Sequence, residues 1–262
     1  MRYRSVVPAL LLERESRFLA RVLRDGHEES VHVKNTGRLR ELLVPGAEVY
    51  LEPSGNPTRR TAHSLVAVRQ GERVVNIDSQ APNEVVHEEL LREDGWLADW
   101  LWTKAANLPL LPDRSQADRA VEPRAPAPSP SHPYVVRREV RFGASRFDFA
   151  LEAANGSRLL LEVKGVTLAA EGLAEFPDAP TARGARHLDE LAAAAREGHS
   201  AAVLFVIQME EIRGFAPCRR IDPAFTDALQ RASAAGVHMA ACDCQVTPDT
   251  LRLNRPVPVT GL

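Results

Sequence analysis

The chain has 262 residues, of which 44% are hydrophobic and 5% aromatic, with a formal net charge of -2. This length exceeds one typical domain of roughly 100–200 residues and predicts two modest domains. The charge excludes a generally basic nucleic-acid binder, so any such contact must come from local patches, and the lack of any run near roughly 20 apolar residues excludes a membrane-spanning protein.

The N-terminal part of the chain predicts a barrel of short strands. Val31 and Val33 alternate with His32 and Lys34, and the Asp25-Gly26 dipeptide is one of several turn signals between such segments. Period-2 patterning bounded by Gly, Pro and Asn is typical of strands and hairpins. A small closed barrel, which removes exposed strand edges, suits five short strands. We expect these strands at residues 17–24, 30–34, 47–51, 63–69 and 73–78.

Two helical segments follow the barrel. Asn83 is a plausible N-cap for a helix over 84–92, and Trp96 and Trp100 stand four residues apart in a second helical run, as a packing stripe does. Residues 112–133 then hold six of the 19 prolines, as counted in the sequence. That composition predicts a flexible extended loop. We expect the loop to interrupt the second domain, because the helices before it and the strands after it need each other.

From residue 134 onward the pattern is α/β. Strand, helix, strand, helix, strand predicts parallel crossovers on a mixed sheet. The expected strands are 135–141, 145–151, 158–166, 201–208 and 237–242, and the expected helices are 181–197 and 223–235. Cys242 and Cys244 lack the second pair that a structural zinc site requires. The domains are therefore expected at 1–81 and 82–262, and, without a signal-peptide pattern, the expected location is the cytoplasm.

Three charged residues are expected to converge on one site in the second domain. Alternation places Asp148 on one face of its strand and Phe147, Phe149 and Leu151 on the other. On the third strand Glu162 and Lys164 share one face. Neighbouring strands would bring the two carboxylates within metal-bridging reach, although each residue alone is more often a surface charge or a solvated salt bridge.

These residue types suit phosphodiester hydrolysis. Two carboxylates can hold Mg²⁺ or Mn²⁺ and leave positions for water and phosphate. The metal lowers the pKa of the water, and a lysine beside it can neutralise charge on the phosphate. Lesser candidates are Glu139, Gln208 at the end of a buried strand, and Arg183 with His187 at i,i+4 on one helix, whose alternative is an exposed helix face. No nucleophile elbow, phosphate-binding glycine loop or dinucleotide fingerprint appears.

The core motif Asp148…Glu162-Val163-Lys164 resembles that of the PD-(D/E)XK, or restriction-endonuclease-like, superfamily. Longer runs resemble the sugar fermentation stimulation protein A family, over roughly residues 15–245. These runs are HVKNTGRL at 32–39, APN at 81–83, GASRFDF at 143–149, EVKGVTL at 162–168 and FPDAPTARGARHL at 176–188. Residues 112–133 depart from the family pattern, which is more compact there.

The resemblance implies an N-terminal OB-fold barrel followed by a restriction-endonuclease-like mixed-sheet α/β domain. It also implies DNA binding and a link to regulation of sugar metabolism, notably maltose use. The superfamily motif makes Asp148 and Glu162 the metal ligands and Lys164 the catalytic lysine, and Glu139 matches a family acidic position. The expected nucleic-acid contacts are Lys34, Asn35, Arg38, Arg146, Arg183 and His187.

Three readings of function follow. The first is a metal-dependent nuclease that hydrolyses phosphodiester bonds in DNA. The second is a non-enzymatic DNA-binding regulator with a vestigial nuclease fold, in which the basic residues of the barrel either contact the backbone or only solvate the surface. The third is an unrelated small-molecule enzyme that uses the same carboxylates. DNA versus RNA, strand preference, cleavage position and a homodimer stay open.

Overall fold

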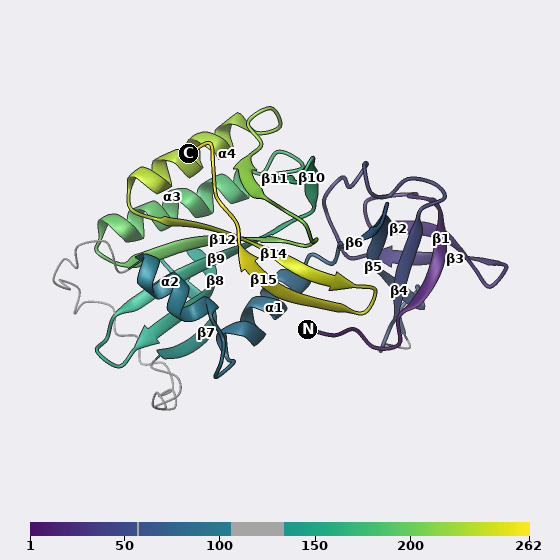
Figure 1. The fold of residues 1–262 in the computed structure, drawn as a ribbon, viewed down its shortest axis with the longest axis horizontal. Helices are drawn as coiled ribbons and strands as arrows, with labels where there is room; N and C mark the ends of the chain where they lie inside the picture. Colours follow the sequence, from purple (N-terminus) through teal and green to yellow (C-terminus); the bar gives the residue numbers. More distant parts are fainter. Residues whose placement is uncertain (57, 106–133) are drawn as a thin grey trace.

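The computed structural model describes residues 1–56, 58–105 and 134–262. The loop expected at 112–133 lies outside the described residues. The described chain forms a barrel and a larger layered domain beside it (Figure 1). Within these ranges no helix has both the length and the apolarity required to cross a membrane.

The N-terminal barrel is a five-stranded closed sheet with a sixth strand at its edge. The strand order is β3-β2-β1-β4-β5-β6, and a parallel pairing of β3 with β5 closes the ring. The expected OB-type barrel is confirmed, but its first strand was not among the five expected, and β6 lies outside the closed ring. The six strands are β1 (Val7–Glu13), β2 (Leu19–Arg24), β3 (His27–Val33), β4 (Glu48–Pro53), β5 (His63–Gln70) and β6 (Arg73–Asn76).

The second domain is built on a six-stranded mixed sheet of order β15-β14-β12-β9-β8-β7. Strand β12 is parallel to both β9 and β14, as crossover connections require. The outer strands pair antiparallel. Its strands are β7 (Tyr134–Phe142), β8 (Ser145–Ala153), β9 (Arg158–Val166), β12 (Ser200–Ile207), β14 (His238–Thr247) and β15 (Thr250–Pro256). A small sheet of β10 (Leu168–Ala170), β11 (Leu173–Phe176) and β13 (Gly214–Pro217) stands beside it.

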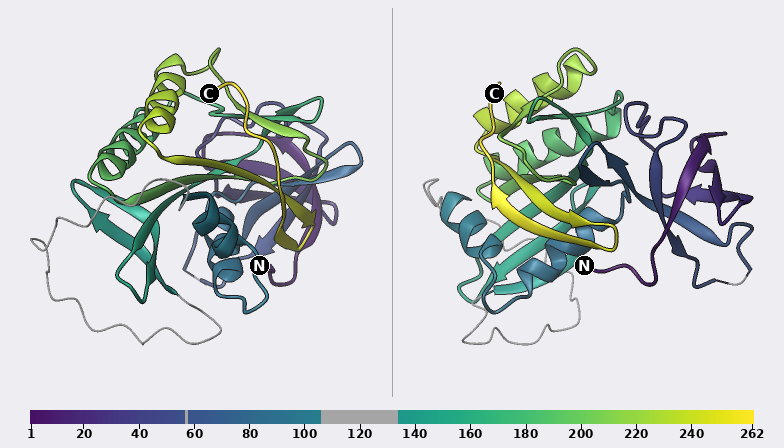
Figure 2. Two further views of the ribbon diagram at one scale, coloured as in Figure 1. Left: turned by 60° about the vertical axis from the view of Figure 1, so that its left-hand side comes forward. Right: turned by 45° about the vertical axis from the view of Figure 1, so that its right-hand side comes forward.

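Helices cover both faces of the large sheet. Helices α3 (Ala182–Arg196) and α4 (Pro223–Ala234) lie on one face, and α1 (Ala81–Leu90) and α2 (Leu97–Ala105) on the other (Figure 2). Along β9, Leu160 and Val166 join the apolar cluster of the α3 face, whereas Leu159, Leu161 and Val163 join that of the α1 face. The residues between them, Glu162 and Lys164, therefore belong to the α3 face.

Strand β8 breaks the alternation expected for it. Phe147 packs in the cluster on the α3 side, but Phe149 and Leu151 pack on the α1 side, so the prediction of one shared face is wrong. The cause lies on the neighbouring strand. Glu139 has a φ of 54°, and the pairing between β7 and β8 omits Glu139 and Asp148. A local irregularity of this kind reorients side chains within a strand.

Candidate functional site

Asp148 lies where β8 separates from β9. The pairing of these strands ends at Phe149↔Leu161, one residue before Asp148. The Asp148 carboxylate takes the place of the missing strand partner: its Oδ2 accepts a hydrogen bond from the backbone N–H of Val163 at 2.8 Å. Its Oδ1 accepts from Nδ2 of Asn83 at 2.8 Å. The carboxylate is thus fixed in the opening between the two strands, with α1 on one side.

Asn83 has a different role from the one expected. Helix α1 begins at Ala81, its N-cap is Gln80, and no side chain caps it, so Asn83 lies inside the helix. The Pro82 ring favours this earlier start, because proline is well tolerated in the first turn. Asn83 is instead a contact of Asp148, and its only sequence signal was its place in the APN run.

Glu162 is the most buried charged group of the site, with 3% of its surface exposed. Its Oε1 accepts hydrogen bonds from Nδ1 of His187, at 2.6 Å, and from Nζ of Lys164. Its Oε2 is buried and has no hydrogen-bond partner. An unpaired buried carboxylate oxygen is costly, so this atom is the one in the site that most requires a partner.

The two carboxylates have opposite pKa shifts. Burial raises the pKa of Asp148, and the negative charge of Glu162 raises it further, against the opposing effect of its hydrogen bonds. Burial also opposes ionisation of Glu162, but the hydrogen bond from His187 and the charge of Lys164 outweigh it and lower the pKa of Glu162. Glu162 is therefore held ionised, while Asp148 carries a charge that lacks full compensation.

His187 and Arg183 extend the site along α3. Thr181 caps this helix by accepting from the backbone N–H of Gly184 at 3.1 Å, which fixes its first turn. His187 is 5% exposed and sits under Glu162 rather than on an exposed helix face. Its Nε2 accepts from Nε of exposed Arg183 at 3.4 Å, so its Nδ1 carries the proton that Glu162 receives. His187 is thus unable to meet a phosphate directly, whereas Arg183 is on the surface.

Two further expected residues lie away from the carboxylates. Glu139 and Arg146 are 52% and 60% exposed and form an ion pair with each other at 2.7 Å. Gln208 is 1% exposed, and its Nε2 donates to Oδ1 of Asn76 at 2.7 Å and to the carbonyl of Asp78. Gln208 therefore joins the second domain to the barrel instead of facing Glu162.

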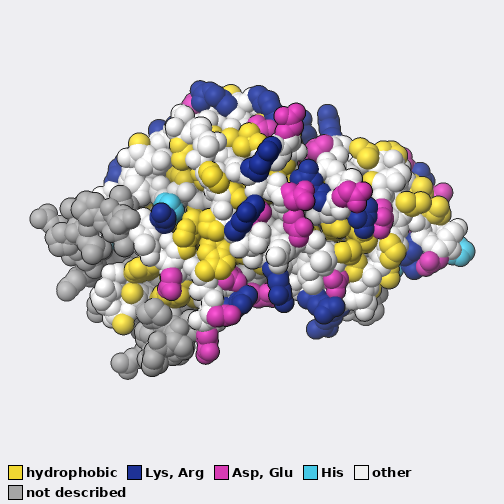
Figure 3. All heavy atoms as spheres, viewed as in Figure 1, with side chains coloured by type: hydrophobic (Ala, Val, Ile, Leu, Met, Phe, Trp, Pro, Cys, Tyr) yellow, Lys and Arg dark blue, Asp and Glu magenta, His cyan; other side chains and the backbone are white. Residues whose placement is uncertain are grey.

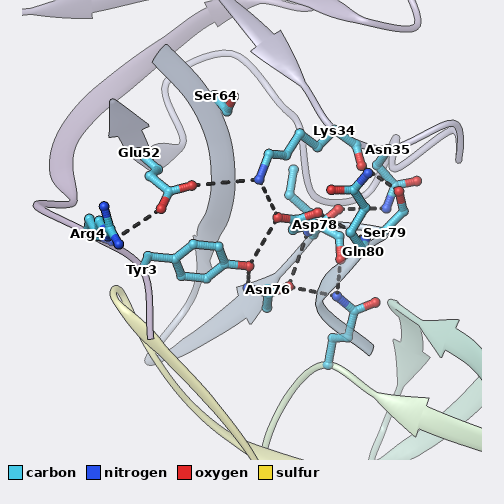
Figure 4. Close-up of polar contacts among 12 residues, drawn as sticks. Tyr3, Arg4, Lys34, Asn35, Glu52, Ser64, Asn76, Asp78, Ser79 and Gln80 are labelled. Atoms are coloured by element: carbon cyan, nitrogen blue, oxygen red, sulfur yellow. Dashed lines mark hydrogen bonds and ion pairs between the residues drawn. The ribbon is translucent and has the colours of Figure 1, made fainter. Parts of the chain in front are cut away.

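The basic residues expected on the barrel are only partly available. Lys34 donates to Oδ2 of buried Asp78 at 2.7 Å and lies 3.6 Å from Glu52 (Figure 4). Asn35 donates to the carbonyl of Ile77 and accepts from the N–H of Gly37, so it holds a turn. The side chain of Arg38 is exposed, and its backbone N–H donates to Asp178 at 3.0 Å.

The geometry brings together Asp148, Glu162, Lys164 and His187, with Asn83 and Arg183 at the margins. Among the described residues no group of three or more His, Cys, Asp or Glu side chains is arranged to hold a metal ion. The possible ligands are thus two carboxylates, one of which has a free buried oxygen. Such an oxygen donor set, with room for water and substrate oxygens, matches Mg²⁺ or Mn²⁺ better than zinc.

Comparisons with known proteins agree on one family. A model described as the sugar fermentation stimulation protein RE domain matches residues 117–250, and one described as the SfsA N-terminal OB domain matches residues 12–77. A sugar fermentation stimulation protein homolog of Desulfitobacterium hafniense is 40% identical over 259 residues, covering 99% of this chain and 98% of its own. A homolog of Alkaliphilus oremlandii is 40% identical over 263 residues with the same coverage of 99% and 98%.

A solved structure shows the same fold over the whole chain. It is that of Pyrococcus furiosus SfsA in complex with Ca²⁺, with a TM-score of 0.76 and 24% sequence identity. The similarity covers 99% of this chain and 98% of the other. The arrangement of barrel and mixed-sheet domain is therefore shared.

Proposed function

This chain belongs to the sugar fermentation stimulation protein (SfsA) family, and from that premise we propose that it is a metal-dependent nuclease, hydrolysing phosphodiester bonds of DNA with Mg²⁺ or Mn²⁺. The observation that carries the proposal is the free Oε2 of Glu162, buried beside Lys164 and near a second carboxylate. Nothing in packing requires three charged side chains there, and a buried unpaired oxygen costs stability unless something binds it.

Asp148 and Glu162 would hold the metal. When bound, a divalent ion supplies Lewis-acid chemistry: it lowers the pKa of a water and stabilises negative charge on the phosphate. Burial and like charge raise the pKa of Asp148, and a bound cation would remove that penalty. The Pyrococcus relative is described as a complex with Ca²⁺, which takes the same kind of oxygen ligands.

The other residues of the chain position these groups. His187 fixes the Glu162 carboxylate through Nδ1, and Asn83 with the Val163 N–H fixes that of Asp148. Lys164 is 15% exposed at its side chain, enough to meet a phosphate while it stays bonded to Glu162. Its ammonium group would neutralise the charge that develops when water attacks the phosphorus and the bond to the leaving oxygen breaks.

The proposal is tested by incubating purified protein with single- and double-stranded DNA and RNA in Mg²⁺, Mn²⁺, Ca²⁺ or EDTA. Cleavage should require the metal, and Lys164→Ala should lower its rate on the order of 10²–10³-fold. Glu152→Gln is a matched control on β8, because Glu152 pairs with Arg137 and Arg158 outside the site. Its rate should match that of the unmodified protein.

The same experiment decides against the regulator. If the protein binds DNA but cuts it with none of these metals, the carboxylates are a structural remnant and function is by occupancy. If cleavage occurs and Lys164→Ala cuts as fast as the unmodified protein, the activity comes from a contaminant or another site.

A further inference from the structure

A continuous groove leads from the barrel to the carboxylates. On the barrel a hollow of about 440 Å³ is lined by Arg17, Thr36, Gly37, Arg38 and Arg40, among others. A cleft of about 320 Å³ between the domains shares Arg17, Thr36 and Gly37 with it. We call the two together the interdomain groove. Its far wall holds Gly165, which follows Lys164, and Thr181, which caps the helix of Arg183.

The groove ends close to the site because the backbone there approaches its neighbours tightly. A Cβ atom on Gly165 would lie 2.7 Å from Gln208 Oε1 and 2.7 Å from the Pro82 ring. Glycine therefore lets the end of β9 reach the junction between α1 and the barrel. This places the last residues of the EVKG run on the wall of the groove.

The cations of the groove are free. Arg17, Arg38 and Arg40 are exposed, and none has a carboxylate within ion-pair distance in the part of the chain that the structure describes. Elsewhere exposed arginines are paired, for example Arg219 with Asp227 at 2.7 Å. Acidic and basic side chains are interspersed in the same way on the face shown in Figure 3. A cluster of unpaired guanidinium groups in a chain of net charge -2 is a local anion site.

The loop that carries these cations is rigid. The Arg14 guanidinium donates to the carbonyls of Arg17, Asn35, Gly37 and Arg38, which ties both edges of the hollow together. Asp178, the acidic group of the cleft, accepts the backbone N–H of Arg38 at 3.0 Å. Because Asp178 is engaged with the backbone, it anchors the loop to the second domain.

An exposed aromatic ring stands next to the cations. Phe18 follows Arg17 and is 49% exposed, and its ring stacks on His32 with 6.4 Å between centroids and 19° between planes. The other ring of the barrel sheet, Tyr50, is 4% exposed. Bases of a single strand stack on such rings, whereas a duplex keeps its base faces covered. The cleft volume also fits a small ligand group of the size of one nucleotide.

We infer that the interdomain groove binds single-stranded nucleic acid, with phosphates against Arg17, Arg38 and Arg40 and a base on Phe18, and leads the strand to Asp148 and Glu162. The inference deepens the proposed nuclease function by naming its substrate class and the path of the strand. DNA and RNA share the phosphates and base faces that this groove recognises, so the experiment separates the two.

The test measures binding in EDTA, where the proposed cleavage is absent. Fluorescence anisotropy with labelled 12-nucleotide oligo-dT, oligo-U and a 12-base-pair duplex gives affinity as a function of salt. A single strand should bind tighter than the duplex, and Arg17→Ala with Arg38→Ala should reduce the salt slope by about 1.4, at about 0.7 for each phosphate contact. Phe18→Ala should weaken binding by about 5- to 150-fold.

Leu10→Ala and Arg219→Ala are matched controls. Leu10 is as exposed as Phe18, at 47%, and neither residue lines the groove. Both controls should bind like the unmodified protein. The inference is overturned if the duplex binds as tightly as both single strands, or if the double arginine variant keeps its slope. If the groove variants lose binding but no metal supports cleavage, the groove stands and the proposed nuclease function fails.

Discussion

Replacing His187 tests how the site holds Glu162. His187→Leu keeps the approximate volume against Phe147, whose ring centroid is 6.3 Å from the imidazole, but removes the donor to Glu162. His187→Asn retains a donor at the place of Nδ1. The two variants therefore separate the loss of the hydrogen bond from the loss of packing.

The magnitude follows from the contact that is lost. The 2.6 Å bond joins two groups that are 5% and 3% exposed, and hydrogen bonds to charged groups contribute about 1.5–3 kcal/mol. Removing the partner of a ligating carboxylate typically costs about 10- to 100-fold in metal affinity. We expect His187→Leu to weaken Mn²⁺ binding within that range and His187→Asn to retain most of the affinity.

Isothermal titration calorimetry with Mn²⁺ measures both variants. His199→Leu is the control, because His199 packs on Phe142 at 5.0 Å and does not bond to Glu162. Far-UV circular dichroism checks that each variant is folded. Equal Mn²⁺ affinity for folded His187→Leu and the unmodified protein would refute the claim that His187 prepares Glu162 for the metal.

Two further predictions concern the barrel. Lys34→Ala should destabilise the protein by about 1–3 kcal/mol in urea denaturation, because it leaves Asp78 buried without its cation, and should leave the salt slope of DNA binding unchanged; stability without change together with a lower slope would assign Lys34 to a phosphate. Burial raises the pKa of Glu29, but hydrogen bonds from Arg24 and His63 outweigh it and lower that pKa below 4.5. The stabilisation is therefore complete above pH 4.5 and lost as pH falls through the lowered pKa; in thermal unfolding the melting temperatures of the unmodified protein and Glu29→Gln should converge there, and a constant gap would contradict this.

The architecture was largely predictable from the sequence, because most strands and helices carry a clear period. The exceptions are short or irregular. Strand β1 has three leucines in a row beside Pro8, so it shows no alternation, although the structure buries Leu11 and exposes Leu10. The short strands β10, β11 and β13 have three or four residues each, too few for a period to be read.

The site was predictable where it depends on one regular strand. Glu162 and Lys164 share a face of β9, and their contact confirms that expectation. The contacts of Asn83 with Asp148 and of His187 with Glu162 join residues 65 and 25 positions apart. Such contacts follow from packing of helices on the sheet, which local patterns do not specify. The face of Phe147 was predicted wrongly because the irregularity arises at Glu139, on the neighbouring strand.

Anomalous diffraction from a crystal soaked with Mn²⁺ tests the metal site most directly. We predict a peak within ligand distance of an Asp148 oxygen and of Glu162 Oε2, the atom that has no partner in the metal-free site. The peak should disappear in Glu162→Gln. A map with Mn²⁺ only elsewhere, at a concentration that supports cleavage, would contradict the account.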